Sequence, residues 1–321
     1  MSNPITAALL GLAVGDALGV PVEFMSREAL KANPVTDVRG YGTHHQPPGT
    51  WSDDASLTFC LAESLLYGYH LRDMAQRFID WSQAKIWTPH GRVFDIGITT
   101  SQSIRILEDI LTNGEEEQLL YLRYEADEYA NGNGSLMRIL PLVFVSQGKP
   151  LEEQFERTWQ VSALTHGHIR AAMACFIYLR FANFLLAGAD KYVAYANTQA
   201  EVADFFAKQA IAASELAHFD RVLRNDIHTL PESAIKSDGY VVHSLEASLW
   251  ALLRNDNYRD TILAAINLGN DTDTTAAIAG GLAGILYTPA GIPANWLDVL
   301  VKKDAIIELG NALYAATILK Y

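Results

Sequence analysis

The most informative stretch of this chain is Asn270-Asp271-Thr272-Asp273-Thr274-Thr275, which runs directly into Ala276-Ala277-Ile278-Ala279-Gly280-Gly281-Leu282-Ala283-Gly284. Two carboxylates precede a run of small and apolar residues. Small residues let a helix approach its neighbours closely, so this run predicts a buried helix over 274–287 whose N-terminus lies deep in the structure. Capping that helix would need only one of the two carboxylates. The second therefore points to a role beyond helix formation.

Apolar residues recur at helical spacing along most of the remaining chain. Two of these stripes consist of Leu57, Cys60, Leu61, Ser64 and Leu65, and of Ala203, Phe206, Ala210 and Ala213. Further patterns of this kind cover residues 71–87, 101–112, 151–164, 169–187, 244–254, 258–268, 274–287 and 304–319. Strand-like alternation is rare, and no linker or repeat divides the chain. We therefore expect one all-α domain over 1–321, with functional residues on loops and helix ends.

Composition agrees with a folded globular protein. The chain has 321 residues, of which 50% are hydrophobic and 19% charged, and its mean hydropathy is +0.06. These values exclude a disordered chain. Lys plus Arg number 24 and Asp plus Glu 37, a formal net charge of −13, which argues against an extended nucleic-acid-binding face. A local pocket for one phosphate group stays compatible with this balance.

The expected location is the cytoplasm. Only Cys60 and Cys175 are present, too few for a disulfide framework or a thiolate zinc site. The N-terminal apolar stretch lacks a basic region and is interrupted by Asp16, so it does not resemble an export signal. The apolar run 171–189 contains Arg180 and predicts a buried helix rather than a membrane span. No heptad seam indicates an oligomeric state.

A second acidic segment, Trp51-Ser52-Asp53-Asp54, follows a Pro-Pro-Gly turn and leads into an apolar helix. Ser and Asp at such a position can simply cap the helix and complement its dipole. If the two acidic segments converge, however, their four aspartates would repel one another unless a cation lay between them. Carboxylates and hydroxyls without Cys or His suit hard ions such as Mg²⁺ or Mn²⁺. A two-metal centre is compatible with this set of ligands.

Two other interpretations of the 271–275 segment fit less well. Its DxDxT pattern also occurs in haloacid-dehalogenase-type phosphotransferases, where the first Asp is the nucleophile. That fold needs a strand before the motif and a long α/β region after it, whereas an Ala/Gly-rich helix follows here. An EF-hand loop would need Gly and Glu where Ala276 and Leu282 stand.

Over nearly its whole length the sequence resembles the ADP-ribosylglycohydrolases, the family of the dinitrogenase reductase-activating glycohydrolase. The matching blocks, in chain order, are Gly11-Leu12-Ala13-Val14-Gly15-Asp16-Ala17-Leu18-Gly19 with Pro21 and Glu23, Trp51-Ser52-Asp53-Asp54, Asp95-Ile96-Gly97 with Thr99-Thr100, Asn131-Gly132-Asn133-Gly134-Ser135-Leu136-Met137-Arg138, Leu164-Thr165-His166, and Asn270-Asp271-Thr272-Asp273-Thr274 with Ala279-Gly280-Gly281. Each block is modest alone, but their order and spacing make the resemblance specific. It implies a compact orthogonal arrangement of helices.

The resemblance also implies a centre of two Mg²⁺ or Mn²⁺ ions. Its ligands would be Ser52, Asp53, Asp54, Asp271, Asp273 and Thr274. One departure concerns Ala55, because the family often has Thr after the Asp-Asp pair. Since the ligand positions are intact, we expect metal binding to survive, with weaker support around the ligands or a divergent substrate.

The resemblance implies two further acidic residues in the site. Glu23 follows the Gly19-Val20-Pro21 turn and by itself would be interpreted as a surface or capping residue. In the family the acidic residue of this block faces the scissile ribose bond, which implies a catalytic or ribose-orienting role. Asp95 matches its Asp-Ile-Gly block and is a second candidate catalytic residue.

The loop Asn131–Ser135 is either a tight turn with a helix cap or a phosphate-binding loop, because its glycines let backbone N–H groups face an anion. The resemblance implies contact with the pyrophosphate of ADP-ribose. The substrate-binding residues carried over are Gly132, Asn133, Gly134, Ser135, Met137 and His166. Arg138 could add positive charge or form an internal salt bridge, and His168 is not carried over.

The predicted activity is metal-dependent hydrolysis of the glycosidic bond between ADP-ribose and its acceptor. The substrate partner would be an ADP-ribosylated protein, although the linkage could be to arginine, serine, a nucleotide or another group. A carboxylate such as Glu23 would transfer a proton or stabilise oxocarbenium-like charge at the ribose C1. The competing hypothesis is a non-catalytic ADP-ribose-binding relative, which retention of all six ligand positions and Glu23 disfavours.

Overall fold

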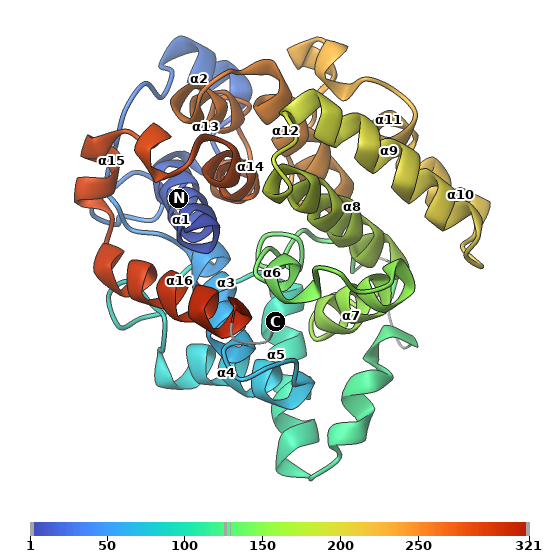
Figure 1. The fold of residues 1–321 in the computed structure, drawn as a ribbon. Coiled ribbons are helices and arrows are strands. Elements are labelled where there is room, and N and C mark those ends of the chain that lie inside the picture. The colour runs from blue at the N-terminus through green and yellow to red at the C-terminus, as the bar shows by residue number, and fades with distance from the viewer. Residues whose placement is uncertain (1–2, 125–126, 129, 319–321) are drawn as a thin grey trace.

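Two helices from opposite ends of the chain form the centre of the fold (Figure 1). Helix α1 (Pro4–Gly19) lies against α14 (Thr272–Tyr287) over most of their length. A Cβ atom at Gly15 would lie 2.1 Å from the Ala276 carbonyl oxygen, and one at Gly284 would lie 2.2 Å from the Ala7 carbonyl oxygen. The predicted close approach of the 274–287 helix, and the deep burial of its N-terminus, are therefore confirmed.

The other helices surround this pair. The computed structural model describes residues 3–124, 127–128 and 130–318, and in these it contains helices and turns but no strand. Helices α3 (Asp53–Leu65) and α16 (Lys303–Ile318) pack against α1, and α8 (Ile169–Leu186), α12 (Val241–Arg254) and α13 (Tyr258–Ile266) pack against α14. The expected all-α fold is confirmed.

The remaining elements complete the outer parts of the molecule. The α-helices are α2 (Arg27–Ala32), α4 (Leu71–Ala84), α5 (Ile98–Thr112), α6 (Leu142–Ser146), α7 (Leu151–Ala163), α9 (Lys191–Ala207), α10 (Ala213–Ala217), α11 (Asp220–Leu223) and α15 (Ala294–Val299). Short 3₁₀ turns cover Val20–Val22, Glu116–Leu120, Leu122–Tyr124, Ile227–Thr229, Glu232–Ala234 and Pro289–Gly291. One hydrophobic cluster links residues from α1 to α16. That a single domain extends over residues 1–321 stays a prediction.

Two sequence-based expectations need correction. Every residue of α1 from Ile5 to Gly19 is buried, so this helix is apolar all round and shows no helical stripe by which to predict it. The stripe ending at Ala210 and Ala213 does not continue one helix, because α9 ends at Ala207 and α10 begins at Ala213. Both alanines are exposed, and the inward face of α9 is formed instead by larger side chains such as Val202 and Phe205.

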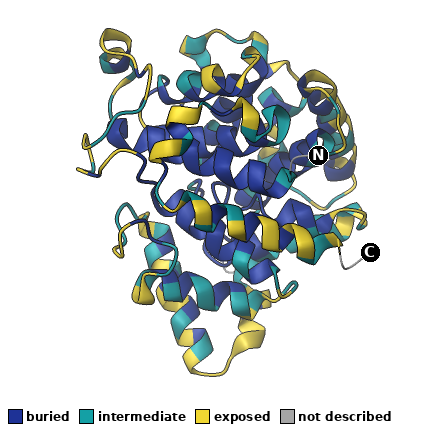
Figure 2. Cartoon of the chain, turned by 60° about the vertical axis from the view of Figure 1, so that its left-hand side comes forward, coloured by how far each residue is buried: buried dark blue, intermediate teal, exposed yellow. Residues whose placement is uncertain are grey.

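Two segments are long and apolar enough to cross a membrane, judged by composition alone: Pro4–Val22 and Ile169–Leu186. All of the first window and 72% of the second are buried inside the protein, and Figure 2 shows the buried helices at its centre. Core packing therefore accounts for their apolar character, as predicted for the 171–189 run. Cys60 and Cys175 are buried and unpaired, and the cytoplasmic location stays a prediction.

Candidate active site

The contact between α1 and α14 brings the two acidic segments together. The Thr274 hydroxyl lies 3.4 Å from Asp54 Oδ2, which also accepts a hydrogen bond of 2.9 Å from the Ser52 hydroxyl. Carboxylate oxygens of Asp16, Asp54 and Asp273 lie within 4.8 Å of one another. The convergence of the N-termini of α3 and α14, which the sequence raised only as a condition, is therefore present in the structure.

Asp16, on α1, completes this acidic cluster and was not recognised as a site residue from the sequence. Its carboxylate accepts hydrogen bonds from the backbone N–H groups of Ser52, at 2.8 Å, and Ala55, at 2.9 Å. The Ser52 hydroxyl accepts the N–H of Asp54 at 3.3 Å. Because Asp16 and Ser52 satisfy the first turn of α3, the carboxylates of Asp53 and Asp54 are not needed for capping.

At the start of α14, only one of the two aspartates hydrogen-bonds to the helix backbone: Asp273 Oδ1 accepts the Thr274 N–H at 2.9 Å. Asp271 is the N-cap residue, but its side chain accepts no bond from the helix backbone. Its Oδ2 instead accepts a hydrogen bond of 2.7 Å from the Asn133 amide. In these two acidic segments, three buried carboxylate oxygens have no hydrogen-bond partner: Asp54 Oδ1, Asp271 Oδ1 and Asp273 Oδ2.

Burial and mutual repulsion make this cluster unstable as a set of bare anions. Burial, followed by the neighbouring carboxylates, raises the pKa of Asp53, Asp54 and Asp273 well above its usual range. Burial also raises the pKa of Asp271, and raises that of Asp16 to about 7. None of the ion pairs found over the described ranges provides these aspartates with a Lys or Arg partner. Unpaired carboxylate oxygens with adjacent hydroxyls fit a hard divalent cation.

Glu23 lies beside the aspartates, at the end of the turn that follows α1. One oxygen each of Glu23, Asp271 and Asp273 lies within 4.8 Å of the others. Two backbone hydrogen bonds anchor the next residues to Asn270. The Phe24 N–H donates to the Asn270 carbonyl oxygen at 2.7 Å, and the Asn270 N–H donates to the Met25 carbonyl oxygen at 2.8 Å. Burial, then Asp95, Asp271 and Asp54, raises the pKa of Glu23 to about 10.

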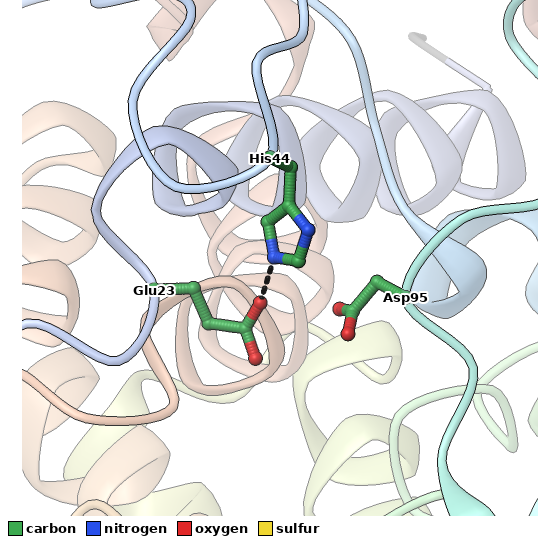
Figure 3. A group of neighbouring side chains, drawn as sticks. All are labelled: Glu23, His44 and Asp95. Carbon is green, nitrogen blue, oxygen red and sulfur yellow. Dashed lines mark hydrogen bonds and ion pairs between the residues drawn. The ribbon is translucent and has the colours of Figure 1, made fainter.

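Asp95 and His44 approach Glu23 from two loops (Figure 3). Asp95 has a backbone φ of +50°, a conformation uncommon for non-glycine residues that often occurs at functional sites. His44 Nε2 forms a hydrogen bond with Glu23 Oε2. His44 was not anticipated, because the 31–48 loop shows no periodicity or motif that would single it out.

A cavity of about 310 Å³ opens onto these groups. Its walls include Glu23, Asp53, Asp95, Gly132, Asn133, Gly134, Met137, His166, Asp271 and Thr274. Ser52, Asp54 and Asp273 are buried next to it without lining it. Ser135 is also fully buried, and its hydroxyl contacts the Ser162 hydroxyl at 2.9 Å and Cys175 Sγ at 3.6 Å. Most of the residues predicted as site residues therefore surround one cavity, and the Ser135 side chain lies behind its wall.

A sequence model of the ADP-ribosylglycohydrolases matches residues 2–321. The chain belongs to the ADP-ribosylglycohydrolase family. It is similar to the ADP-ribosylarginine hydrolase Tri1 of Serratia proteamaculans, with 32% identity over 316 residues that cover 96% of this chain and 78% of that protein. It is also 28% identical to the ADP-ribosyl-[dinitrogen reductase] glycohydrolase of Rhodospirillum rubrum, over 92% of this chain and 90% of that one.

A solved structure described as an ADP-ribosylglycohydrolase-related protein complex has the same fold. The match has a TM-score of 0.79 and 31% sequence identity, and it covers 98% of both chains. Together with the enzyme names of relatives at 32% identity, these findings identify the protein as a glycohydrolase. A phosphotransferase of the haloacid-dehalogenase type does not fit, because across the described chain no strand precedes Asp271.

The glycine loop of this glycohydrolase is shaped by His166. A Cβ atom at Gly134 would lie 2.7 Å from His166 Cε1, and one at Gly132 would lie 3.3 Å from His166 Nε2. Both glycines therefore make room for the imidazole. Burial lowers the pKa of His166 to about 3, so the ring is neutral at physiological pH, and its Nδ1 pairs with the Thr165 hydroxyl at 2.8 Å.

The segment after the loop differs from the expected helix start. Residues 133–138 form turns, and the next helix, α6, begins only at Leu142. Arg138 is fully buried below the loop, where it donates to the Gly134 carbonyl oxygen and packs on the Phe78 ring. Its contacts are therefore with a carbonyl group and a ring rather than a carboxylate. His168 caps α8 by accepting the Arg170 N–H at 3.3 Å.

Two apolar side chains stand at the mouth of the glycohydrolase cavity. Phe24 is 68% exposed and Ile98 is 78% exposed, and both line the cavity. At the mouth of the cavity these two side chains are open to any molecule that enters it. Ala55, where the family often has Thr, is fully buried in α3, and its N–H donates a hydrogen bond to Asp16.

Proposed function

We propose that this protein hydrolyses the bond between the ribose C1 of ADP-ribose and an arginine side chain of a modified protein, using divalent cations held by the acidic cluster. The observation that carries the proposal is a set of buried carboxylates without countercharge beside a cavity that Glu23 and Asp95 enter. Relatives named as ADP-ribosylarginine hydrolases favour arginine as the acceptor.

The proposed cations are two Mg²⁺ or Mn²⁺ ions. Their ligands would be Ser52, Asp53, Asp54, Asp271, Asp273 and Thr274. The three unpartnered carboxylate oxygens and the lack of a basic partner, among the described residues, support this assignment. Once bound, such ions supply Lewis acidity, orient oxygen ligands such as ribose hydroxyls and water, and favour the ionised carboxylates. Asp16 would support the centre by fixing the backbone of Ser52 and Ala55.

Glu23 is the proposed proton-transferring residue. Its carboxyl group is buried at the cavity wall, and the raised pKa keeps it protonated at neutral pH when no cation is present. A protonated carboxyl group can donate to the nitrogen that leaves the ribose, and its conjugate base can then accept a proton from the attacking water. Cations bound nearby would lower the pKa of Glu23 toward the range useful for such exchange.

Asp95 is the proposed contact for the arginine side of the bond. One of its carboxylate oxygens lies within 4.8 Å of Glu23, and the residue lines the cavity (Figure 3). A carboxylate pairs well with a guanidinium group through charge-assisted hydrogen bonds. Asp95 would therefore hold the acceptor while Glu23 exchanges the proton.

The nucleotide part of the substrate would lie along the glycine loop. Gly132, Asn133, Gly134 and Met137 line the cavity next to the neutral His166, which can form hydrogen bonds without adding charge. A second cavity of about 340 Å³ shares Thr99 with the first. The two cavities together offer a volume within the range of small-molecule sites, which is roughly 300–1,000 Å³.

The test is release of ADP-ribose by the purified protein from arginine-, serine- and nucleotide-linked substrates, with Mg²⁺, with Mn²⁺ and with EDTA. We expect release from the arginine conjugate, loss of release in EDTA, and a decrease of about 10²–10⁴-fold in Glu23→Gln. Asp204→Asn, which changes an exposed carboxylate on α9, is the matched control. Release from serine alone would refute the arginine assignment, and no release from any conjugate would refute the proposed reaction.

A further inference from the structure

The loop before α3 reaches into the site through one side chain. Residues 41–46 fold back on themselves, with an isolated bridge between Tyr41 and Gln46. The Thr43 N–H donates to the Pro21 carbonyl oxygen at 3.0 Å, and the Thr43 hydroxyl donates to the Glu23 carbonyl oxygen at 2.7 Å. The loop is thus attached to the backbone on both sides of the turn that carries Glu23.

At the tip of this loop, His44 is held in one orientation. Its ring centroid lies 6.0 Å from that of Phe24 and 5.5 Å from that of Phe94, so the imidazole is flanked by two aromatic rings. The side chain is only 15% exposed, and Gln46 donates to the His44 carbonyl oxygen at 2.8 Å. Packing therefore directs His44 Nε2 at Glu23 Oε2, as the dashed line in Figure 3 shows.

We propose that His44 is a positioning residue for the reaction: it holds the Glu23 carboxyl group in one orientation, close to Asp95 and to the aspartates of α14. This inference rests on the proton-transferring role proposed for Glu23. His44 acts through Glu23 alone, because it does not line the cavity.

The need for such a residue follows from the surroundings of Glu23. Three acidic side chains lie close to it: one oxygen each of Asp95, Asp271 and Asp273 lies within 4.8 Å of a Glu23 oxygen. A glutamate has several rotatable bonds, so its carboxyl group could turn toward any of these acidic neighbours. His44 is a non-acidic hydrogen-bond partner of Glu23 Oε2, so it selects the orientation in which Glu23 faces the cavity.

Two substitutions separate the hydrogen bond from ring packing. His44→Phe keeps an aromatic ring between Phe24 and Phe94 but removes the nitrogen, whereas His44→Gln removes the ring but keeps an N–H donor. His45→Asn is the matched control: His45 is the exposed neighbour on the same loop, and Asn tolerates its φ of +53°. The measurements are kcat and KM for ADP-ribosylarginine hydrolysis with saturating Mn²⁺, and Mn²⁺ binding by titration calorimetry.

We expect His44→Phe to lower kcat by about 10- to 100-fold, as loss of an orienting partner does in other sites, with KM and Mn²⁺ affinity within about threefold of the wild type. His44→Gln should recover kcat to within about fivefold, and His45→Asn should match the wild type. If His44→Phe keeps kcat within twofold, or His44→Gln falls as far as His44→Phe, the positioning role is wrong while the hydrolase function stands. A wild-type protein that releases no ADP-ribose overturns both.

Discussion

The backbone contact between α1 and α14 gives the sharpest prediction about how this site is held together. In Gly15→Ala, the new Cβ would lie 2.1 Å from the Ala276 carbonyl oxygen, whereas an ordinary contact of this kind is 3.4 Å or longer. Both atoms belong to helix backbones, so no side chain can turn aside. The two helices must therefore move apart by about 1 Å, the scale at which misplacement costs about 10²-fold in rate.

The expected effect on stability has the opposite sign to that of helix propensity. Replacing Gly by Ala inside a helix normally stabilises it by about 0.5–1 kcal/mol. Overpacking of a core costs about 1–3 kcal/mol, so the net free energy of unfolding should fall by up to about 2 kcal/mol. Urea unfolding in Mn²⁺ measures this change. The Mn²⁺ affinity and the rate of ADP-ribosylarginine hydrolysis report whether the two halves of the site have moved apart.

Gly281→Ala is the matched comparison, because Gly281 lies on α14, the helix that Gly15 contacts, but faces side chains. Its Cβ would meet Leu140 Cδ2 at 2.5 Å and the Tyr178 hydroxyl at 2.9 Å, both at the ends of side chains that can shift. We expect it to bind Mn²⁺ as the wild type does and to lose clearly less stability than Gly15→Ala. If Gly15→Ala is as stable as the wild type and equally active, the argument that this backbone contact sets the geometry of the site is refuted.

Three further predictions concern the acidic cluster and the cavity mouth. Asp273→Asn should abolish tight Mn²⁺ binding yet raise the melting temperature in EDTA, because one buried charge is removed; a lower melting temperature in EDTA would contradict this. In EDTA, the wild-type free energy of unfolding should fall as the pH rises from about 4 to about 7, because the raised pKa of Asp16 keeps a proton on the folded state that the unfolded state has lost. Urea unfolding at about pH 5 and about pH 7.5 checks the sign, and a higher free energy of unfolding at the higher pH would contradict the prediction. Phe24→Ala and Ile98→Ala should raise KM several-fold for an ADP-ribosylated protein but not for free ADP-ribosylarginine, and equal effects on the two substrates would exclude an acceptor-binding role.

The amino-acid sequence predicts the fold class and the acidic half of the site for a clear physical reason. Helices such as α4, α5 and α7 have one buried and one exposed side and therefore leave a periodic pattern. The aspartates are conspicuous because each pair exceeds what a helix start requires. Convergence of the two pairs could be stated only as a condition, since the residues that join them are far apart in the chain.

The residues that sequence analysis missed lack such a signal. Asp16 lies in a helix that is buried on all sides, so its carboxylate resembles an interruption of an apolar run. Its partners are the backbone N–H groups of Ser52 and Ala55, which no side-chain pattern records. His44 lies on an irregular loop, and only the folded arrangement of Thr43, Phe24 and Phe94 around it directs its ring at Glu23.

The pairing of the first helix with the fourteenth has a consequence for how the protein is made. The Thr272 hydroxyl donates a hydrogen bond to the Gly19 carbonyl oxygen, 253 residues away in the chain. The Asn3 side-chain amide donates one to the Gly310 carbonyl oxygen, 307 residues away. During synthesis, α1 leaves the ribosome long before its partner exists, with apolar surface on every side. Until α14 emerges, the nascent chain has neither a centre to fold around nor a complete acidic cluster, so the cluster can form only after α14 has been translated. A prematurely terminated product would expose α1 and invite chaperones or aggregation rather than act as a weaker enzyme.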